Sequence, residues 1–258
     1  MFTRNATGQN PFGLIRKVLT RGSYTLRTGY WHSGERSCPD FPDEIFVSHS
    51  KVYSFASQFC AGKRILDVGC GTGYGTSFLS ESADSAIGVD ISRQALRYAR
   101  KHYGNSKTEF LRMRSECLFL GDRRFDFVVS VENFEHLRDH RAGLRNMSRV
   151  LVDSGLLLLT TPNPEMFFGT SNPYHTHEFA YDELLQIIQE YFSECLICEN
   201  LLTPTTEEGR RLREARHQRG AAGVDLTRHP WLWGNRVDTT YLCNTHSFIC
   251  FARHPRRG

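Results

Sequence analysis

Short apolar runs alternate with amphipathic stretches through the middle of this chain. The runs carry β-branched or large apolar residues and are bounded by glycine or polar turns, which is typical of buried parallel strands. The intervening stretches repeat apolar residues at helical spacing. The pattern predicts strands over 64–68, 85–91, 108–113, 125–131 and 156–161, with helices over 74–82, 93–103 and 141–151. Alternation of this kind predicts a parallel sheet with right-handed crossovers.

The flanking regions extend this layout. Residues 45–59 recur at helical spacing through Ile45, Val52, Phe55 and Phe59, so a helix is expected beside the first strand. Beyond the fifth strand, the pattern predicts a helix over 181–192, a strand over 195–202 and an antiparallel strand over 241–252. We therefore expect an α/β fold with a seven-stranded, mostly parallel sheet whose last strand is antiparallel.

Length and composition fit one α/β domain with additions. The chain has 258 residues and a formal charge of +4, and none of its apolar runs approaches the roughly 18 residues of a membrane-spanning helix. Several of the eight cysteines fall inside apolar runs, as buried thiols do. We expect a reduced, cytoplasmic protein.

The N-terminal segment differs in charge from the rest. Five basic residues and no acid precede Glu35. An organelle transit peptide has this character too, but we favour an N-terminal lid over 1–60 preceding a catalytic domain over 61–258. Within that domain, the Arg-rich stretch 203–240 is expected as an insertion.

Alternating glycines follow the first predicted strand. Gly69, Gly71 and Gly73 allow a tight turn and a close approach of backbone to ligand, and Asp90 ends the next strand at a distance suited to a ribose diol. A dinucleotide fingerprint needs a small residue at its sixth position. Tyr74 or Thr76 stands there instead, so the sequence argues against a pyrophosphate ligand.

This loop, with Asp67 two residues ahead, resembles motif I of the class I S-adenosylmethionine (SAM) methyltransferases. The resemblance implies their Rossmann-like seven-stranded fold. It implies that Asp67 and the glycines Gly69, Gly71 and Gly73 hold the methionine end of SAM. Asp90, with Ile91 beside it, is then expected at the ribose.

Two further segments bear on the cofactor. Gly34-Glu35-Arg36 resembles a segment found ahead of motif I in glycan-associated methyltransferases. The resemblance implies that Arg36 pairs with the methionine carboxylate of SAM; the alternative is a solvated arginine in a surface loop. After the third strand, the acid that many relatives aim at adenine is replaced by Arg114. The backbone of Ser115, or the carboxylate of Glu116, is the expected substitute.

Acidic and imidazole side chains cluster after the fourth strand. Glu132, Glu135 and His136 resemble the E-x-x-E-H segment of ubiquinone-pathway and small-RNA O-methyltransferases, which helps to hold a divalent metal. A returning loop brings His175 and His177, either of which would complete the ligand set. Such ligands suit Mg²⁺, Mn²⁺, Fe²⁺ or Zn²⁺. A metal-free alternative makes His136 or His175 a general base, with Glu132 also catalytic; a purely structural role is the third.

The resemblance implies methyl transfer from SAM to a hydroxyl of a small molecule, such as a sugar of a glycan or natural product. The five arginines within 210–219 favour an anionic or carrier-linked acceptor, or simply a solvated helix. An RNA methyltransferase is a rival, although the pI of 8.6 and the lack of a recognisable RNA-binding module argue against nucleic acid. A non-catalytic SAM-binding partner subunit is the other rival.

Overall fold

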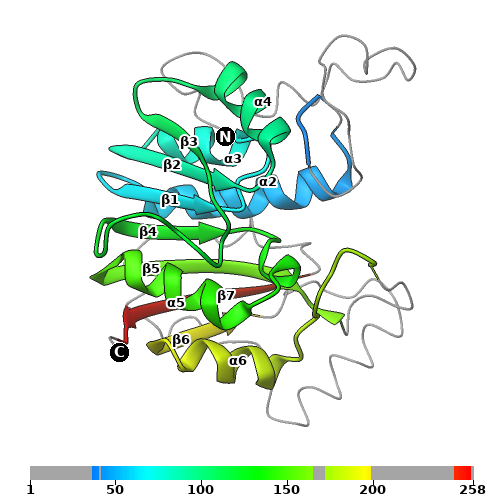
Figure 1. The fold of residues 1–258 in the computed structure, drawn as a ribbon, viewed down its shortest axis with the longest axis vertical. Helices are drawn as coiled ribbons and strands as arrows, with labels where there is room; N and C mark the ends of the chain where they lie inside the picture. Colours follow the sequence, from blue (N-terminus) through cyan, green and yellow to red (C-terminus); the bar gives the residue numbers. More distant parts are fainter. Residues whose placement is uncertain (1–36, 41, 165–171, 199–246, 257–258) are drawn as a thin grey trace, which may run out of the picture.

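The computed structural model describes residues 37–40, 42–164, 172–198 and 247–256. They form a seven-stranded sheet in the order β3-β2-β1-β4-β5-β7-β6, which runs from the top to the bottom of Figure 1. The strands are β1 (Arg64–Val68), β2 (Ser85–Asp90), β3 (Thr108–Arg112), β4 (Phe125–Ser130), β5 (Leu151–Pro162), β6 (Phe192–Cys198) and β7 (Ser247–Pro255).

Strand pairing confirms the predicted topology. The pairs β3-β2, β2-β1, β1-β4 and β4-β5 are parallel, whereas β7 is antiparallel to both β5 and β6. The carboxyl ends of β1, β2 and β4 therefore meet at one edge. In a doubly wound sheet, ligands bind at that edge.

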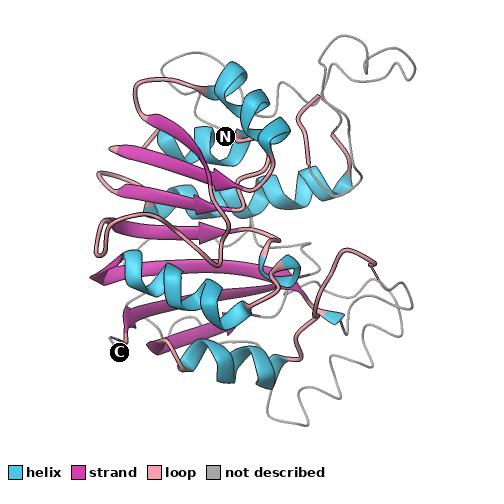
Figure 2. Cartoon of the chain, in the orientation of Figure 1, coloured by secondary structure: helices cyan, strands magenta, loops and turns pink. Residues whose placement is uncertain are grey.

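Helices cover both faces of the sheet (Figure 2). They are α2 (Glu44–Ala56), α3 (Tyr74–Ser80), α4 (Arg93–Tyr103), α5 (His140–Val150) and α6 (Tyr181–Gln189), with short 3₁₀ turns η2 (Ser57–Phe59) and η3 (Phe134–His136). Residues of α5 and α6 join one core cluster, and residues of α2 and α3 join the cluster on the opposite face. No helix in the described ranges is both long and apolar enough to cross a membrane.

Several element boundaries depart from the predicted ones. Strand β6 begins at Phe192 rather than Cys195, α3 ends at Ser80 rather than Ser82, and β5 starts at Leu151, directly after α5. In α2, Val52 and Phe55 are buried as expected, but Ile45 is 51% exposed in the first turn. Ser92 caps α4 as predicted, because its hydroxyl accepts the N–H of Ala95.

Candidate functional site

The glycine loop at the end of β1 is shaped by left-handed backbone. Gly69 has φ +80° and Gly71 has φ +54°, conformations that a side chain would strain. A Cβ on Gly69 would also lie 2.3 Å from Cγ of Asn133, whereas one on Gly71 would meet no atom within 4 Å. Gly69 therefore accommodates a neighbouring loop, and Gly71 leaves its backbone open to a ligand.

Asp90 is oriented by backbone groups at the end of β2. Its carboxylate accepts the N–H of Gly71 at 3.0 Å and the N–H of Ser92 at 2.7 Å. These bonds link β2 to the glycine loop. A carboxylate has about four lone-pair sites, so Asp90 keeps the capacity to accept two hydroxyls of a ribose.

Asp67 lies below the loop and is not among the residues that line the cavity. It is fully buried and accepts hydrogen bonds from the hydroxyls of Tyr53 (3.1 Å) and Thr76 (2.6 Å). Burial raises its pKa to about 7. The structure thus places Asp67 where it braces α2 and α3 against β1, not where it touches a ligand directly.

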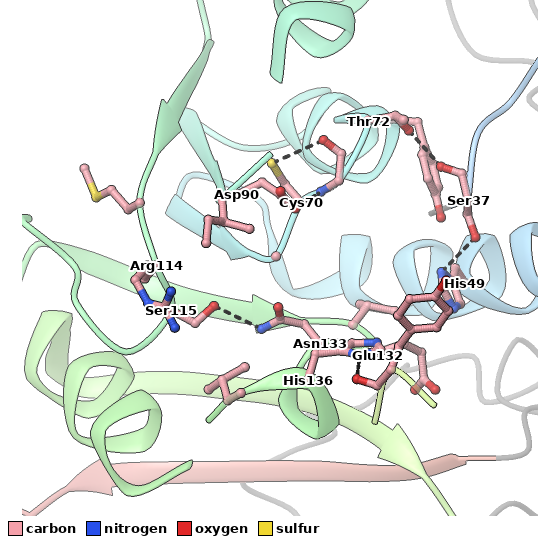
Figure 3. A pocket seen from close by; sticks show the side chains of 18 of the residues that line it. Ser37, His49, Cys70, Thr72, Asp90, Arg114, Ser115, Glu132, Asn133 and His136 are labelled. Carbon is pink, nitrogen blue, oxygen red and sulfur yellow. Dashed lines mark hydrogen bonds between the residues drawn. The ribbon is translucent and has the colours of Figure 1, made fainter. Parts of the chain in front are cut away.

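A cavity of about 460 Å³ opens over these elements (Figure 3). This volume is within the usual range of small-molecule sites, about 300 to 1,000 Å³. Its walls come from the glycine loop, the end of β2 and the loops after β3 and β4. Of the predicted cofactor residues, the lining includes Gly69, Gly71, Asp90, Ile91 and Ser115.

The segment ahead of β1 also contributes to the cavity. Ser37 and His49 line it, and the Ser37 carbonyl accepts the hydroxyl of Thr72 at 2.9 Å. Burial lowers the pKa of His49 to about 4, so its imidazole is neutral at pH 7. Sequence reasoning did not single out His49. The predicted contact of Arg36 lies outside the described residues. The same holds for residues 203–240, predicted as an insertion, and for most of the predicted lid over 1–60.

Asn133 connects the loops after β1, β3 and β4. Its amide donates to the hydroxyls of Ser115 and Ser130, each at 3.2 Å. Arg114, which stands where an adenine-binding acid was expected, forms an ion pair with Glu116 at 3.1 Å. Both lie on the cavity wall, so a carboxylate is present at this end, two residues after the expected position.

Glu132 adopts a left-handed conformation directly after β4. Its φ of +46° is rare for a residue with a side chain, and such strain concentrates at functional sites. Its N–H donates to the hydroxyl of Thr160 at 3.1 Å, which fixes the turn. The oxygen Oε1 is buried without a hydrogen-bond partner among the described residues, and burial raises the pKa of this carboxyl group. Glu132 lines the cavity.

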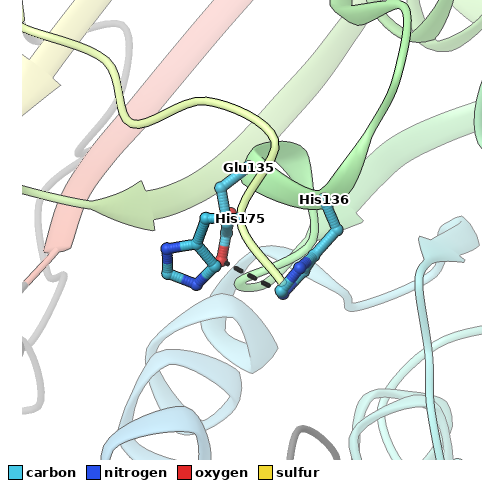
Figure 4. A group of neighbouring side chains, drawn as sticks. All are labelled: Glu135, His136 and His175. Atoms are coloured by element: carbon cyan, nitrogen blue, oxygen red, sulfur yellow. Dashed lines mark ion pairs between the residues drawn. The ribbon is translucent and has the colours of Figure 1, made fainter. Parts of the chain in front are cut away.

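Glu135, His136 and His175 converge beside the cavity, and one ligand atom of each lies within 4.8 Å of the others (Figure 4). Glu135 and His136 approach to 3.7 Å between Oε1 and Nε2. His136 Nδ1 donates to the carbonyl of Tyr174 at 3.0 Å. In the neutral ring, Nε2 therefore carries the lone pair on the side of Glu135.

The donor set of this cluster fits a divalent cation. Glu135 is 1% exposed, and its Oε2 accepts the hydroxyl of Thr161 at 3.1 Å, which orients Oε1 toward His136. A carboxylate beside imidazole is a usual donor set for a divalent cation. The carbonyl of Tyr174 supplies the outer hydrogen bond that metal-bound imidazoles usually make. Nδ1 of His175 donates to Glu178 at 2.7 Å, and Nε2 accepts from the amide of Asn172 at 2.9 Å, so a metal would bind Nε2 only after Asn172 moves away.

Two predicted ligands lie apart from this cluster. His177 pairs through Nε2 with Glu183 at 2.9 Å, and its side chain is exposed. Glu132 is on the cavity wall but is not among the three grouped residues. The described residues therefore bring together three of the five predicted metal ligands.

Known proteins resemble this chain in sequence and in fold. Residues 66–159 match a family model described as "Methyltransferase domain". A probable S-adenosylmethionine-dependent methyltransferase of Mycobacterium tuberculosis is 32% identical over 75% of this chain and 70% of its own length. An O-methyltransferase of Aspergillus nomiae is 30% identical over 55% of this chain and 67% of its own length.

A solved structure of similar fold is the methyltransferase in a Haloferax volcanii complex with the activator Trm112. It superimposes with a TM-score of 0.59 over 83% of this chain and 92% of its own, at 15% sequence identity. At that identity the similarity concerns the fold alone.

Proposed function

Because this chain belongs to the SAM-dependent methyltransferases, we propose that it transfers the methyl group of SAM to a hydroxyl oxygen of a small molecule. A sugar of a glycan or of a natural product is the acceptor we favour. The observation that carries this proposal is the convergence of Glu135, His136 and His175 next to the cavity. The O-methyltransferase similar to this chain supports the choice of oxygen.

The cofactor occupies the part of the cavity under the glycine loop. Gly69 and Gly71 receive the methionine end. Gly73, predicted to do the same, does not line the cavity and lies against Ala99 and Phe110. The carboxylate of Asp90 accepts the ribose hydroxyls, with Ile91 along one side. The Ser115 backbone faces the adenine. Since the side chain of Ser115 is tied to Asn133, its backbone is held in place for that contact.

The acceptor occupies the part beside the loop after β4. Glu135, His136 and His175 would hold a divalent metal there, and this metal would supply Lewis acidity that lowers the pKa of the acceptor hydroxyl. Glu132 takes the hydroxyl proton through Oε1, which has no other partner among the described residues. As the oxygen–carbon bond forms, the carbon–sulfur bond of SAM breaks and S-adenosylhomocysteine leaves. Alignment of the two reactants supplies most of the rate.

Metal analysis of the wild type beside Glu135→Ala and His136→Ala tests the metal. We expect about one equivalent in the wild type, at least tenfold less in both variants, and a parallel loss of methyl transfer. Equally little metal in all three, with an active wild type, would refute metal assistance.

Transfer of labelled methyl from SAM to a panel of hydroxylated sugars, with RNA in parallel, tests the acceptor. We expect product on the sugars. Methylated RNA without methylated sugar would show that the acceptor is RNA and would overturn the sugar acceptor. SAM binding in calorimetry without turnover on any acceptor would favour a non-catalytic, SAM-binding partner subunit.

A further inference from the structure

A second cavity, of about 340 Å³, lies against α4 and the edge strand β3. Its lining consists of buried Leu96 and four arginines: Arg93, Arg97, Arg100 and Arg112. We refer to it as the arginine cavity. None of these residues lines the cavity of about 460 Å³ that we propose for SAM, which we call the cofactor cavity. Ile91 connects the two cavities, because it lines the cofactor cavity and its carbonyl accepts a hydrogen bond from Nε of Arg112 at 2.8 Å.

The arginines are arranged to point at one space. Arg93, Arg97 and Arg100 follow each other at intervals of four and three residues, so they share one face of α4. Arg112 approaches from β3. Two of the four guanidinium groups are fixed by the backbone, since Arg100 donates to the carbonyl of Phe110 at 2.6 and 3.0 Å and Arg112 donates to Ile91.

Carboxylates of the described residues do not pair with this charge. None of the four arginines forms an ion pair with a carboxylate in the described ranges, and α4 contains no acidic residue. Some arginines elsewhere on the surface are paired, as in Arg64 with Asp126 (2.9 Å) and Arg141 with Glu190 (2.7 Å), whereas Arg124 and Arg145 form no ion pair with a described carboxylate. What distinguishes the four cavity arginines is that they gather around one space.

The unpaired charge is unfavourable for the helix itself. Arg93 stands in the first turn of α4, where the helix dipole disfavours a cation. Arg93 and Arg97 are like charges four residues apart, which also destabilises a helix. A bound anion removes both costs.

We infer that the arginine cavity binds a phosphate group of a ligand other than SAM. Guanidinium groups match phosphate oxygens with paired N–H donors, and two groups already anchored lose little freedom on binding. The cavity of about 340 Å³ has room for a phosphate or pyrophosphate group together with part of the molecule that carries it, and buried Leu96 adds an apolar contact. Such a group belongs either to a soluble phosphorylated molecule or to a phospholipid headgroup.

Calorimetric titration with inorganic pyrophosphate at constant ionic strength tests this site. We expect saturable binding to the wild type and at least a tenfold weaker affinity in Arg93→Gln/Arg97→Gln, which removes two charged hydrogen-bonding groups. Lys101→Gln is the matched control, because it removes one charge from the same helix without touching the cavity; its affinity should stay within about twofold.

Sedimentation with vesicles of phosphatidylcholine and phosphatidic acid separates the two sources. Binding that Arg93→Gln/Arg97→Gln abolishes and pyrophosphate displaces would assign a lipid headgroup, and an absence of sedimentation would assign a soluble phosphate. The inference is overturned if wild-type binding of pyrophosphate is not saturable, or if Lys101→Gln weakens it as much as the double variant. SAM titration of the same samples reports separately on the cofactor site.

Discussion

The two halves of the cofactor cavity differ in the groups that line them. Under the loop after β1, the cavity wall is backbone. The N–H groups of Gly69 and Gly71 donate to the Val89 carbonyl (2.8 Å) and the Asp90 carboxylate (3.0 Å), which fixes the loop, and Gly71 has open space where a side chain would stand. Beside the loop after β4, the ligand meets ionisable side chains, among them Glu132 and His136. The first half is suited to recognising one fixed molecule, and the second to chemistry on a variable one.

This difference has a consequence for mutations. In the backbone-built half, an added methyl group is the damaging change, because it fills space and strains φ. In the side-chain-built half, the damaging change is one that removes a charge while keeping the shape of the side chain. The four predictions below test this contrast, beginning with the largest effect.

Gly69→Ala should weaken SAM binding at least about 100-fold, measured by calorimetry. The new Cβ would lie 2.6 Å from Cβ of Asn133 at a φ of +80°, so Asn133 would have to leave its bonds to Ser115 and Ser130. Gly62→Ala is the control, since Gly62 has φ +67° but no atom within 4 Å of its added Cβ. It should lower stability by about 1 kcal/mol and leave SAM binding intact. Equal SAM affinities in the two variants would contradict the prediction.

Glu132→Gln should lower kcat about 100-fold while the Kd for SAM changes less than about twofold. The substitution keeps the shape of the side chain and removes the acceptor of the proton. Steady-state kinetics and SAM titration of one preparation measure both quantities. An unchanged kcat would exclude Glu132 as the base.

Asp67→Asn should change how stability depends on pH. The pKa of Asp67 is about 7 in the folded protein, above its ordinary value of 3.8, because of burial. Between these values the folded state holds a proton that the unfolded chain has released, so stability falls as pH rises and levels off above about 7. Between pH 5 and pH 8, the titration of Asp67 lowers the free energy of unfolding by about 2 to 3 kcal/mol. Urea unfolding at both pH values measures this difference.

The amide introduced by Asp67→Asn does not titrate, so this variant should lack that decline. Asp126→Asn serves as the control: a hydrogen bond from Arg64 lowers the pKa of Asp126, and its stability contribution is lost only at acid pH. A decline of equal size in Asp67→Asn would show that another group causes it.

His177→Gln should leave metal affinity within about twofold of the wild type, whereas His136→Gln should lower it about 10- to 100-fold. His177 pairs with Glu183 at the surface, and His136 faces Glu135. Metal-competition titrations compare the two. Equal losses would place His177 in the ligand set after all.

The backbone-built half was predictable from sequence because its signals are local. The glycines at 69, 71 and 73 predict the turn, and the apolar run ending in Asp90 predicts the strand before it. The same locality predicted the alternation of strands and helices that makes the sheet mostly parallel. Element boundaries were harder to predict where a residue fits both the helical and the strand spacing. Phe192 continues the apolar spacing of α6, yet it is the first residue of β6 and packs in the core.

The contacts that complete the site were not predictable from local pattern. Tyr53 has the spacing of an ordinary core residue on α2, and its bond to Asp67 exists only because α2 packs beside β1. Asn133 gains its role from loops that the fold brings together. His177 stands two residues after His175 on an extended loop, and sequence spacing alone does not distinguish which imidazole turns toward Glu135.

The position of β7 bears on how the polypeptide matures. This strand comes last among the described elements, yet it lies between β5 and β6 and pairs with both. While the ribosome is still adding residues 247–255, β6 has no neighbour with which to form its ladder. The nascent chain therefore completes its central layer only when that final stretch has left the exit tunnel, and until then β5 presents an open edge to other chains and to chaperones.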